Sequence, residues 1–157
     1  MPYSRQFFVG GPNSIRGWAI RDIGPGGYHD FALGNATTKP YPFQAADIKF
    51  EFNSEYRFPL FWRFNSAVFF DAGNIWNLKK DEKLPNGNFD KFWANQIAIS
   101  SGLGLRVDAS FATIRFDLGF KLREAYSSQT TGNNWISLND YSWKRNVNPN
   151  FALGFPF

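Results

Sequence analysis

The chain has 157 residues, which is enough for one domain with one hydrophobic core. It contains 19 Phe, 6 Trp and 6 Tyr but no Cys, so disulfides and cysteine-based zinc sites are excluded. Its net charge of +4 comes from basic residues that alternate with acidic ones, and this distribution argues against nucleic-acid binding. Aromatic residues that alternate with polar ones instead indicate a sheet with one apolar and one wet face.

The first five residues contain no apolar run like the centre of a signal peptide. No stretch approaches the roughly 18 apolar residues that a transmembrane helix needs. A strand of a membrane barrel needs only about 9–11 alternating residues, so a membrane barrel stays compatible with the sequence. Because such a barrel must be exported, we expect the chain to be part of a longer exported protein in which Met1 need not be the native start.

The first predicted element is a long polar connection over residues 10–46. Near its start, Ile15-Arg16-Gly17-Trp18 places an isolated arginine between apolar side chains, in a stretch whose glycines permit a tight loop. The guanidinium would be costly to bury without a carboxylate partner. This stretch is therefore the first candidate for a functional site.

Five later segments alternate apolar and polar residues with a period of two, which is typical of β-strands. They run over about 47–58, 63–76, 96–108, 112–123 and 148–157. In the first segment all the charged side chains share one face, and the opposite face carries none. The charged set is Asp47, Lys49, Glu51, Glu55 and Arg57.

The connections between these segments are alternately short and long. Residues 59–62 and 109–112 are short enough for tight turns, whereas 77–95 and 124–146, like the first loop, are long and polar. Outer-membrane barrels combine short periplasmic turns with long outer loops in this way. Aromatic residues at the predicted strand ends fit the girdles of such barrels. They are Trp62, Trp76, Trp93, Trp143 and Phe157.

These features predict an all-β fold, namely the last five antiparallel strands of a transmembrane β-barrel, in a single domain over residues 1–157. Five strands cannot close a barrel, since about eight are needed. The other strands must come from upstream sequence, from another chain or from further copies of this one, because open sheet edges invite pairing. A soluble β-sandwich also alternates, but it has no reason to keep its short turns at one end.

Arg16 has two natural partners on the charged faces of the first two strands, Glu55 and Asp71. A planar guanidinium can bind one carboxylate with two N–H groups and still donate to another. We find no nucleophile–base pairing and no phosphate-binding loop, so we expect no enzyme activity, cofactor or metal. The one histidine, His29, lies in a Gly-rich loop and is expected to be exposed to solvent.

Three segments resemble motifs of one family in the order in which that family has them. Residues 15–18 resemble the Val/Ile-Arg-Gly-Phe/Tyr motif of the BamA/TamA superfamily of barrel assembly factors and two-partner-secretion transporters. The Phe-Asp-Ala-Gly-Asn segment around Asp71 resembles its Phe-Asp-x-Gly strand, and residues 150–157 resemble its aromatic C-terminal strand. Ala152 departs from the general outer-membrane signal, whereas Gly154 fits the BamA-like form. The motif and its surroundings look closer to TamA-like paralogues of Bacteroidetes than to BamA itself.

The resemblance implies a 16-stranded barrel in the bacterial outer membrane with a periplasmic C-terminus. The loop with Ile15, Arg16, Gly17 and Trp18 would enter the lumen, where Arg16 pairs with Asp71 as a lock and Glu55 is a second acceptor.

The last strand would form a weak seam and carry the C-terminal signal. Its residues are Phe151, Leu153, Gly154, Phe155, Pro156 and Phe157. Because proline has no N–H, Pro156 either leaves this strand poorly paired, so that a client strand can add to it, or merely caps the strand end.

The implied function is outer-membrane protein assembly, insertion or translocation, without catalysis. Expected partners are outer-membrane lipid and lipopolysaccharide, client outer-membrane proteins, and the rest of the barrel or other copies of the chain, but no nucleic acid. A passive porin or small-molecule transporter is the alternative, although it has no need for the Arg–Gly loop. The Arg16–Asp71 pair also has a plainer interpretation, as a buried structural clamp.

Overall fold

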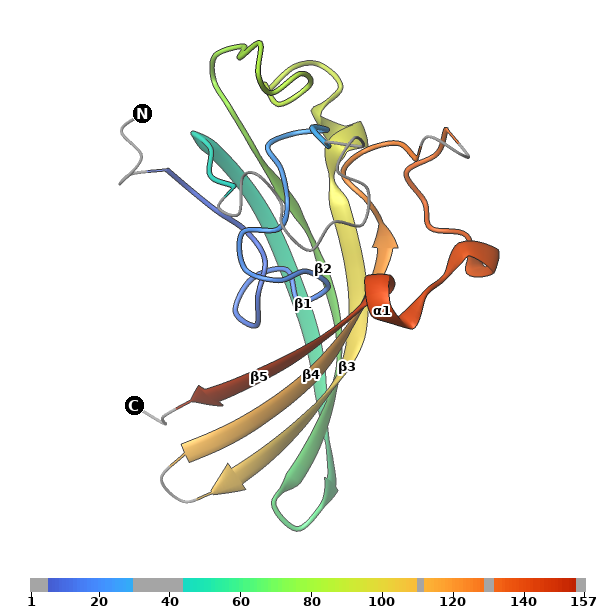
Figure 1. Cartoon of the computed structure of the whole chain (residues 1–157). Coiled ribbons are helices and arrows are strands. Elements are labelled where there is room, and N and C mark those ends of the chain that lie inside the picture. Colours follow the sequence, from blue (N-terminus) through green and yellow to red (C-terminus); the bar gives the residue numbers. More distant parts are fainter. Residues whose placement is uncertain (1–5, 30–43, 110–111, 129–131, 155–157) are drawn as a thin grey trace.

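The computed structural model describes residues 6–29, 44–109, 112–128 and 132–154. Five strands form one antiparallel sheet in which each strand pairs with its neighbour in the sequence. They are β1 (Ile48–Phe61), β2 (Phe64–Trp76), β3 (Ala98–Ala109), β4 (Ala112–Arg123) and β5 (Val147–Gly154). Figure 1 shows a curved sheet with the β1–β2 turn, the end of β3 and the start of β4 at one end and the long connections at the other. The predicted all-β fold class is confirmed.

Helical structure in the described residues is limited to three short turns. They are the 3-10 helices η3 (Trp93–Gln96) and η4 (Leu138–Asp140) and the α-helix α1 (Trp143–Asn146). No helix in the described part of the chain has the length and apolar character needed to cross a membrane.

The strand ends differ slightly from the predicted ones. β1 continues to Phe61, beyond the predicted end at 58, because its ladder with β2 resumes after a register shift between Pro59 and Phe61. This leaves residues 62–63 as the turn. β3 begins at Ala98 rather than at 96, because residues 93–96 form η3. The predicted last strand extended to 157, and residues 155–157 lie outside the described part.

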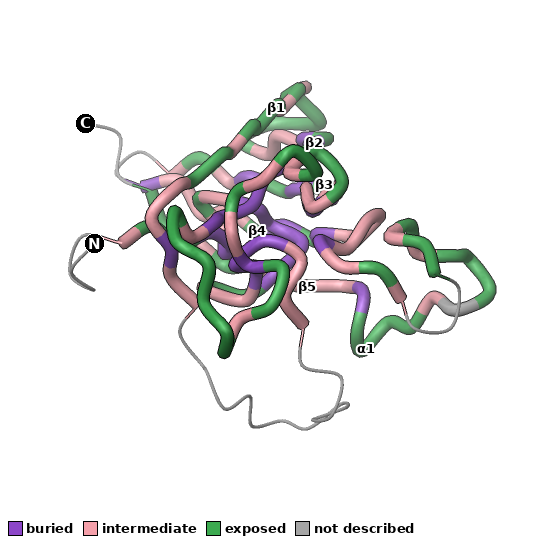
Figure 2. Tube along the Cα trace, turned by 90° about the horizontal axis from the view of Figure 1, so that it is seen from above, coloured by how far each residue is buried: buried purple, intermediate pink, exposed green. Residues whose placement is uncertain are grey.

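The two faces of the sheet differ in the way that the alternation predicts. We call the face that contacts loop residues 7–26 the inner face and the opposite one the outer face. The outer face exposes large apolar side chains from every strand. They include Phe52, Tyr56, Val68, Phe70, Leu103, Phe116, Phe151 and Leu153. Figure 2 shows that buried segments gather where the loop meets the sheet.

Trp76 does not belong to an exposed aromatic girdle. It is fully buried, and its ring makes edge contacts with Phe89 and Trp93 at centroid distances of 5.6 and 6.3 Å. Its indole N–H donates to Gln96 Oε1 at 2.6 Å, because residues 77–96 fold back over this strand end. Trp62 and Trp143, by contrast, are well exposed.

His29 is not fully exposed, contrary to the prediction. It is half-buried, and its ring stacks on that of Tyr126, with 3.8 Å between the centroids and 4° between the planes. Burial raises the pKa of Tyr126 above its ordinary value. The sequence could not reveal this contact, since nearly a hundred residues separate the two loops.

Candidate functional site

The loop that carries Arg16 closes on itself. The Gly11 N–H donates to the Trp18 carbonyl at 2.8 Å, and the Ser14 N–H donates to the Gly11 carbonyl at 3.1 Å. Gly10 and Gly11 have φ angles of 103° and 92°, which residues with a Cβ rarely adopt. A Cβ at Gly10 would also lie 2.1 Å from the Ala19 carbonyl oxygen. The local sequence therefore makes the tight loop possible.

Apolar side chains on both sides of Arg16 anchor the loop to the inner face. Ile15 and Trp18 are both buried and join one cluster with residues of the sheet. The cluster consists of Val9, Ile15, Trp18, Ile23, Ala46, Ile75, Ala98 and Ala125. Burying a large aliphatic side chain contributes about 1.5–3 kcal/mol. The motif's apolar residues thus fix the backbone from which Arg16 projects.

Beneath Arg16, the strand register lines up one residue from each strand in a single row. Glu55 pairs with Phe69, Phe69 with Gly102, Gly102 with Gly119, and Gly119 with Asn148. The row thus offers a carboxylate, an aromatic ring, two glycines and an amide. The glycines make the middle of the row shallow, so that a ring and a backbone segment can lie on it. A Cβ at Gly102 would be 2.2 Å from Phe69 Cζ.

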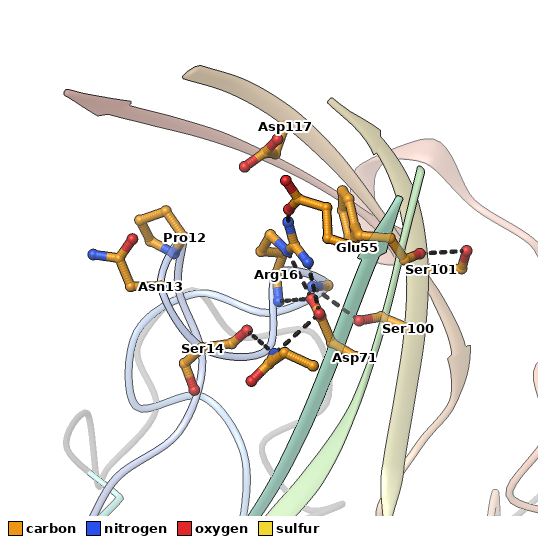
Figure 3. Close-up of polar contacts among 12 residues, drawn as sticks. Pro12, Asn13, Ser14, Arg16, Glu55, Asp71, Ser100, Ser101 and Asp117 are labelled. Atoms are coloured by element: carbon orange, nitrogen blue, oxygen red, sulfur yellow. Dashed lines mark hydrogen bonds and ion pairs between the residues drawn. The ribbon is translucent and has the colours of Figure 1, made fainter. Parts of the chain in front are cut away.

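Arg16 and Asp71 form a buried ion pair on the inner face of β2 (Figure 3). Arg16 Nη2 donates to Asp71 Oδ1 at 2.8 Å, and Nε and the backbone N–H donate to Oδ2 at 2.9 and 3.0 Å. Asn53, opposite Asp71 on β1, donates to Oδ1 at 3.0 Å. Arg16 is 4% exposed and Asp71 is 0% exposed. The structure brings together the two residues that the sequence analysis paired.

Glu55 is shared by three arginines rather than serving Arg16 alone. Arg16 Nη1 and Arg106 Nη2 both donate to Glu55 Oε2, the latter at 2.8 Å. Arg57 Nε donates to Oε1 at 2.5 Å. Arg106 Nη1 also donates to Asp117 Oδ1 at 2.8 Å. The ion pairs therefore extend from β1 to β4.

The Arg16 guanidinium lies over the Phe69 ring, with 3.6 Å between its central carbon and the ring centroid. Burial alone would lower the pKa of Arg16, but the hydrogen bonds to Asp71 and Glu55 raise it above its ordinary value. The side chain is therefore cationic. Such a cation over an aromatic face gains about 0.5–2 kcal/mol, and more as water is excluded.

The backbone of the motif lies directly on β3 and β4. The Gly17 N–H donates to Ser100 Oγ at 3.3 Å, and a Cβ at Gly17 would lie 2.5 Å from Ser100 Cβ. A Cβ at Gly119 would lie 2.3 Å from the Arg16 carbonyl oxygen. Residues with larger side chains at these two places would lift the loop.

The Arg16 carbonyl oxygen accepts hydrogen bonds from β5. Asn148 Nδ2 donates at 3.0 Å and Asn150 Nδ2 at 2.8 Å. Together with Glu55 on β1, Asp71 on β2 and the close approaches to β3 and β4, these bonds mean that Arg16 and Gly17 contact all five strands.

The predicted C-terminal residues lie away from this loop where they are described. Phe151 and Leu153 are exposed on the outer face, and Gly154 is the last residue of β5. Phe155, Pro156 and Phe157 were predicted for the seam and lie outside the described residues.

The sequence analysis missed five of the residues that contact or surround Arg16. They are Phe69, Arg106, Asp117, Asn148 and Asn150. Their positions in the period-two alternation of each strand place all of them on the inner face, and this alternation could be read from the sequence. Which inner-face residues reach the loop depends on strand register and on the path of the loop.

A family model described as the Omp85 superfamily domain matches residues 1–145 of the chain. The matched range includes the loop motif, Glu55 and Asp71, and it ends two residues before β5 begins. No curated protein and no solved structure matches the chain. The predicted BamA/TamA-superfamily resemblance is confirmed at this level. The chain belongs to the Omp85 superfamily of bacterial outer-membrane proteins, which gives it a general role in outer-membrane protein assembly or translocation.

Proposed function

We propose that the chain is the barrel part of a factor that inserts or translocates proteins through a weak seam at its last strand, with Arg16, Asp71 and Glu55 as a loop lock in the lumen. The observation that carries this proposal is the buried Arg16–Asp71 pair, because it lies at the tip of a loop that contacts every strand of the sheet.

A buried ion pair gives the loop one defined docked state. Removing either partner typically costs about 3–5 kcal/mol, because the remaining charge stays buried without compensation. A passive pore needs open space in its lumen, whereas this loop lies against all five strands of the inner face and is held by both charge and packing. We infer that the short turns and the end of β5 face the periplasm. The partners are client outer-membrane proteins, outer-membrane lipid and lipopolysaccharide, and the remaining strands of the barrel.

A charge exchange in the full-length protein tests the lock. Arg16→Asp and Asp71→Arg should each reduce insertion of a client barrel at least about tenfold, because each leaves two like charges buried together. The double variant should restore part of the activity. The measurement is the fraction of client that becomes protease-resistant in the outer membrane.

The ion pair between Lys49 and Glu51 offers a control on the same face of β1: Lys49 lines a pocket with residues of the loop, but neither side chain takes part in the ion pairs and hydrogen bonds of Arg16. Exchanging these two charges, singly or together, should leave insertion near the wild-type level. If the Arg16→Asp and Asp71→Arg variants both inserted the client at the wild-type level, the lock would have no role in insertion.

A passive porin remains the second candidate, and planar-bilayer recording separates the two. The assembly factor should show only small, irregular conductance while the loop is docked. A large, steady and ion-selective conductance from the wild-type protein would favour the porin. The similarity to TamA-like paralogues stays a prediction.

A further inference from the structure

The hydrogen bonds between the loop and β5 differ from the ion pair that defines the lock. We propose that Asn148 and Asn150 are positioning residues that couple docking of the Arg16 loop to the placement of β5. An extended client segment that pairs with β5 and displaces it would then weaken the docking of the loop. This inference rests on the proposed function, in which the last strand forms the seam.

The two amides are placed by simple strand geometry. Residues two apart on a strand point to the same face, so Asn148 and Asn150 both face the loop. A carbonyl oxygen has two lone pairs, so the Arg16 oxygen can accept from both at once. Asn148 Nδ2 also lies 3.3 Å from Asn150 Oδ1, which orients the two side chains relative to each other.

β5 depends on such contacts more than its neighbours do. Pro149 lies between the two asparagines and has no N–H to donate, which restricts a strand to the edge of a sheet. β5 is an edge strand of the described sheet. Because Pro149 donates no ladder bond, the position of β5 is more sensitive to two additional side-chain bonds.

The coupling runs through the main chain of Arg16 rather than through its charge. The side chain binds carboxylates on β1 and β2, while the carbonyl oxygen binds β5 and lies against Gly119 of β4. One residue therefore connects the two edges of the sheet. Both asparagines follow the last residue of the family match at 145, so the contact is not among the features that identify the family.

Thermodynamic linkage requires that loop docking and the placement of β5 affect each other equally. If loop docking stabilises β5 by some factor, displacement of β5 must weaken loop docking by the same factor. A client segment that adds to the edge of β5 as an extra strand would need to shift this strand to compete with the loop. The loop would then leave the lumen more readily when β5 is engaged.

Amide hydrogen exchange on the full-length protein in lipid bilayers tests the coupling without any client. The first variant, Asn148→Ala with Asn150→Ala, removes both side-chain amides. The second, Asn148→Asp with Asn150→Asp, keeps the side-chain shapes and removes the donors. In both, exchange of the β5 amides should rise about tenfold, because two hydrogen bonds of ordinary net strength are lost. The β2 amides should stay as protected as in the wild type, which shows that the sheet is intact.

Asn65→Ala is the matched control, because it removes an asparagine amide that donates to Asp108 Oδ2 at 2.6 Å, beside the β1–β2 turn and not to the loop. It should leave the exchange of both the loop amides and the β5 amides at the wild-type level. Unchanged β5 exchange in both asparagine pairs, or an equal rise in Asn65→Ala, would overturn the coupling. Such a result would be independent of the lock, since client insertion by the Arg16 variants is a separate measurement.

Discussion

Arg16 is held by different chemistry on the two sides of the sheet. Toward β1 and β2 it is held by charge, through its two-point contact with Asp71 and the shared carboxylate of Glu55. Toward β4 and β5 its carbonyl oxygen is held by neutral amides above a glycine, although Arg115 of β4 also donates to the Pro12 carbonyl of the same loop at 2.7 Å. A broken buried ion pair leaves a costly bare charge, whereas a broken amide bond can be replaced by water. The first side therefore suits an anchor, and the second suits a contact that opens.

The substitution Asp71→Asn should remove the main charged contact toward β1 and β2. It should have the largest effect of the substitutions on the free energy of unfolding. It keeps the side-chain shape but leaves the Arg16 charge without its main partner. The free energy of unfolding should fall by about 3–5 kcal/mol. Urea unfolding of the refolded full-length barrel in lipid vesicles measures this change.

Asp108→Asn is the matched control for that experiment. Asp108 is exposed and accepts from Asn65 and Thr113, so its loss should cost at most about 1 kcal/mol. A loss at Asp71 no larger than the loss at Asp108 would contradict the view that charge anchors the loop.

Gly119→Ala addresses the opposite side of the sheet. Its Cβ would lie 2.3 Å from the Arg16 carbonyl oxygen and 2.8 Å from the Gly17 nitrogen, so the loop backbone must rise. Overpacking of this kind should cost about 2 kcal/mol. The β5 amides should then exchange faster, while the bonds from the flexible Arg16 side chain to Asp71 persist.

Gly27→Ala serves as the control, because a Cβ there would meet its nearest neighbours at 3.5 Å, an ordinary contact distance. It should leave both unfolding and exchange near wild type. If Gly119→Ala behaved like Gly27→Ala, the loop would not rest on β4 as closely as described.

The sequence predicted most of the fold because alternation and connection length are local signals. It also paired Arg16 with Asp71 and Glu55, since a buried arginine needs a carboxylate and the charged faces of the first strands supply few. It did not predict that Trp76 is covered, because that depends on how residues 77–96 fold back. It did not single out Asn148 either, because the row that aligns it with Glu55 follows from the register of five strands.

Glu55→Gln should have the smallest effect of the three, although Glu55 binds the most arginines. Arg16 keeps both oxygens of Asp71, Arg106 keeps Asp117, and the exposed Arg57 contributes little. We expect a loss of about 1 kcal/mol in the free energy of unfolding. Combined with Asp71→Asn, however, the loss should exceed the sum of the two single losses, because Arg16 then has no carboxylate left. Additive losses would mean that Glu55 and Asp71 hold separate structures, and the charged side of the sheet would then not be one anchor.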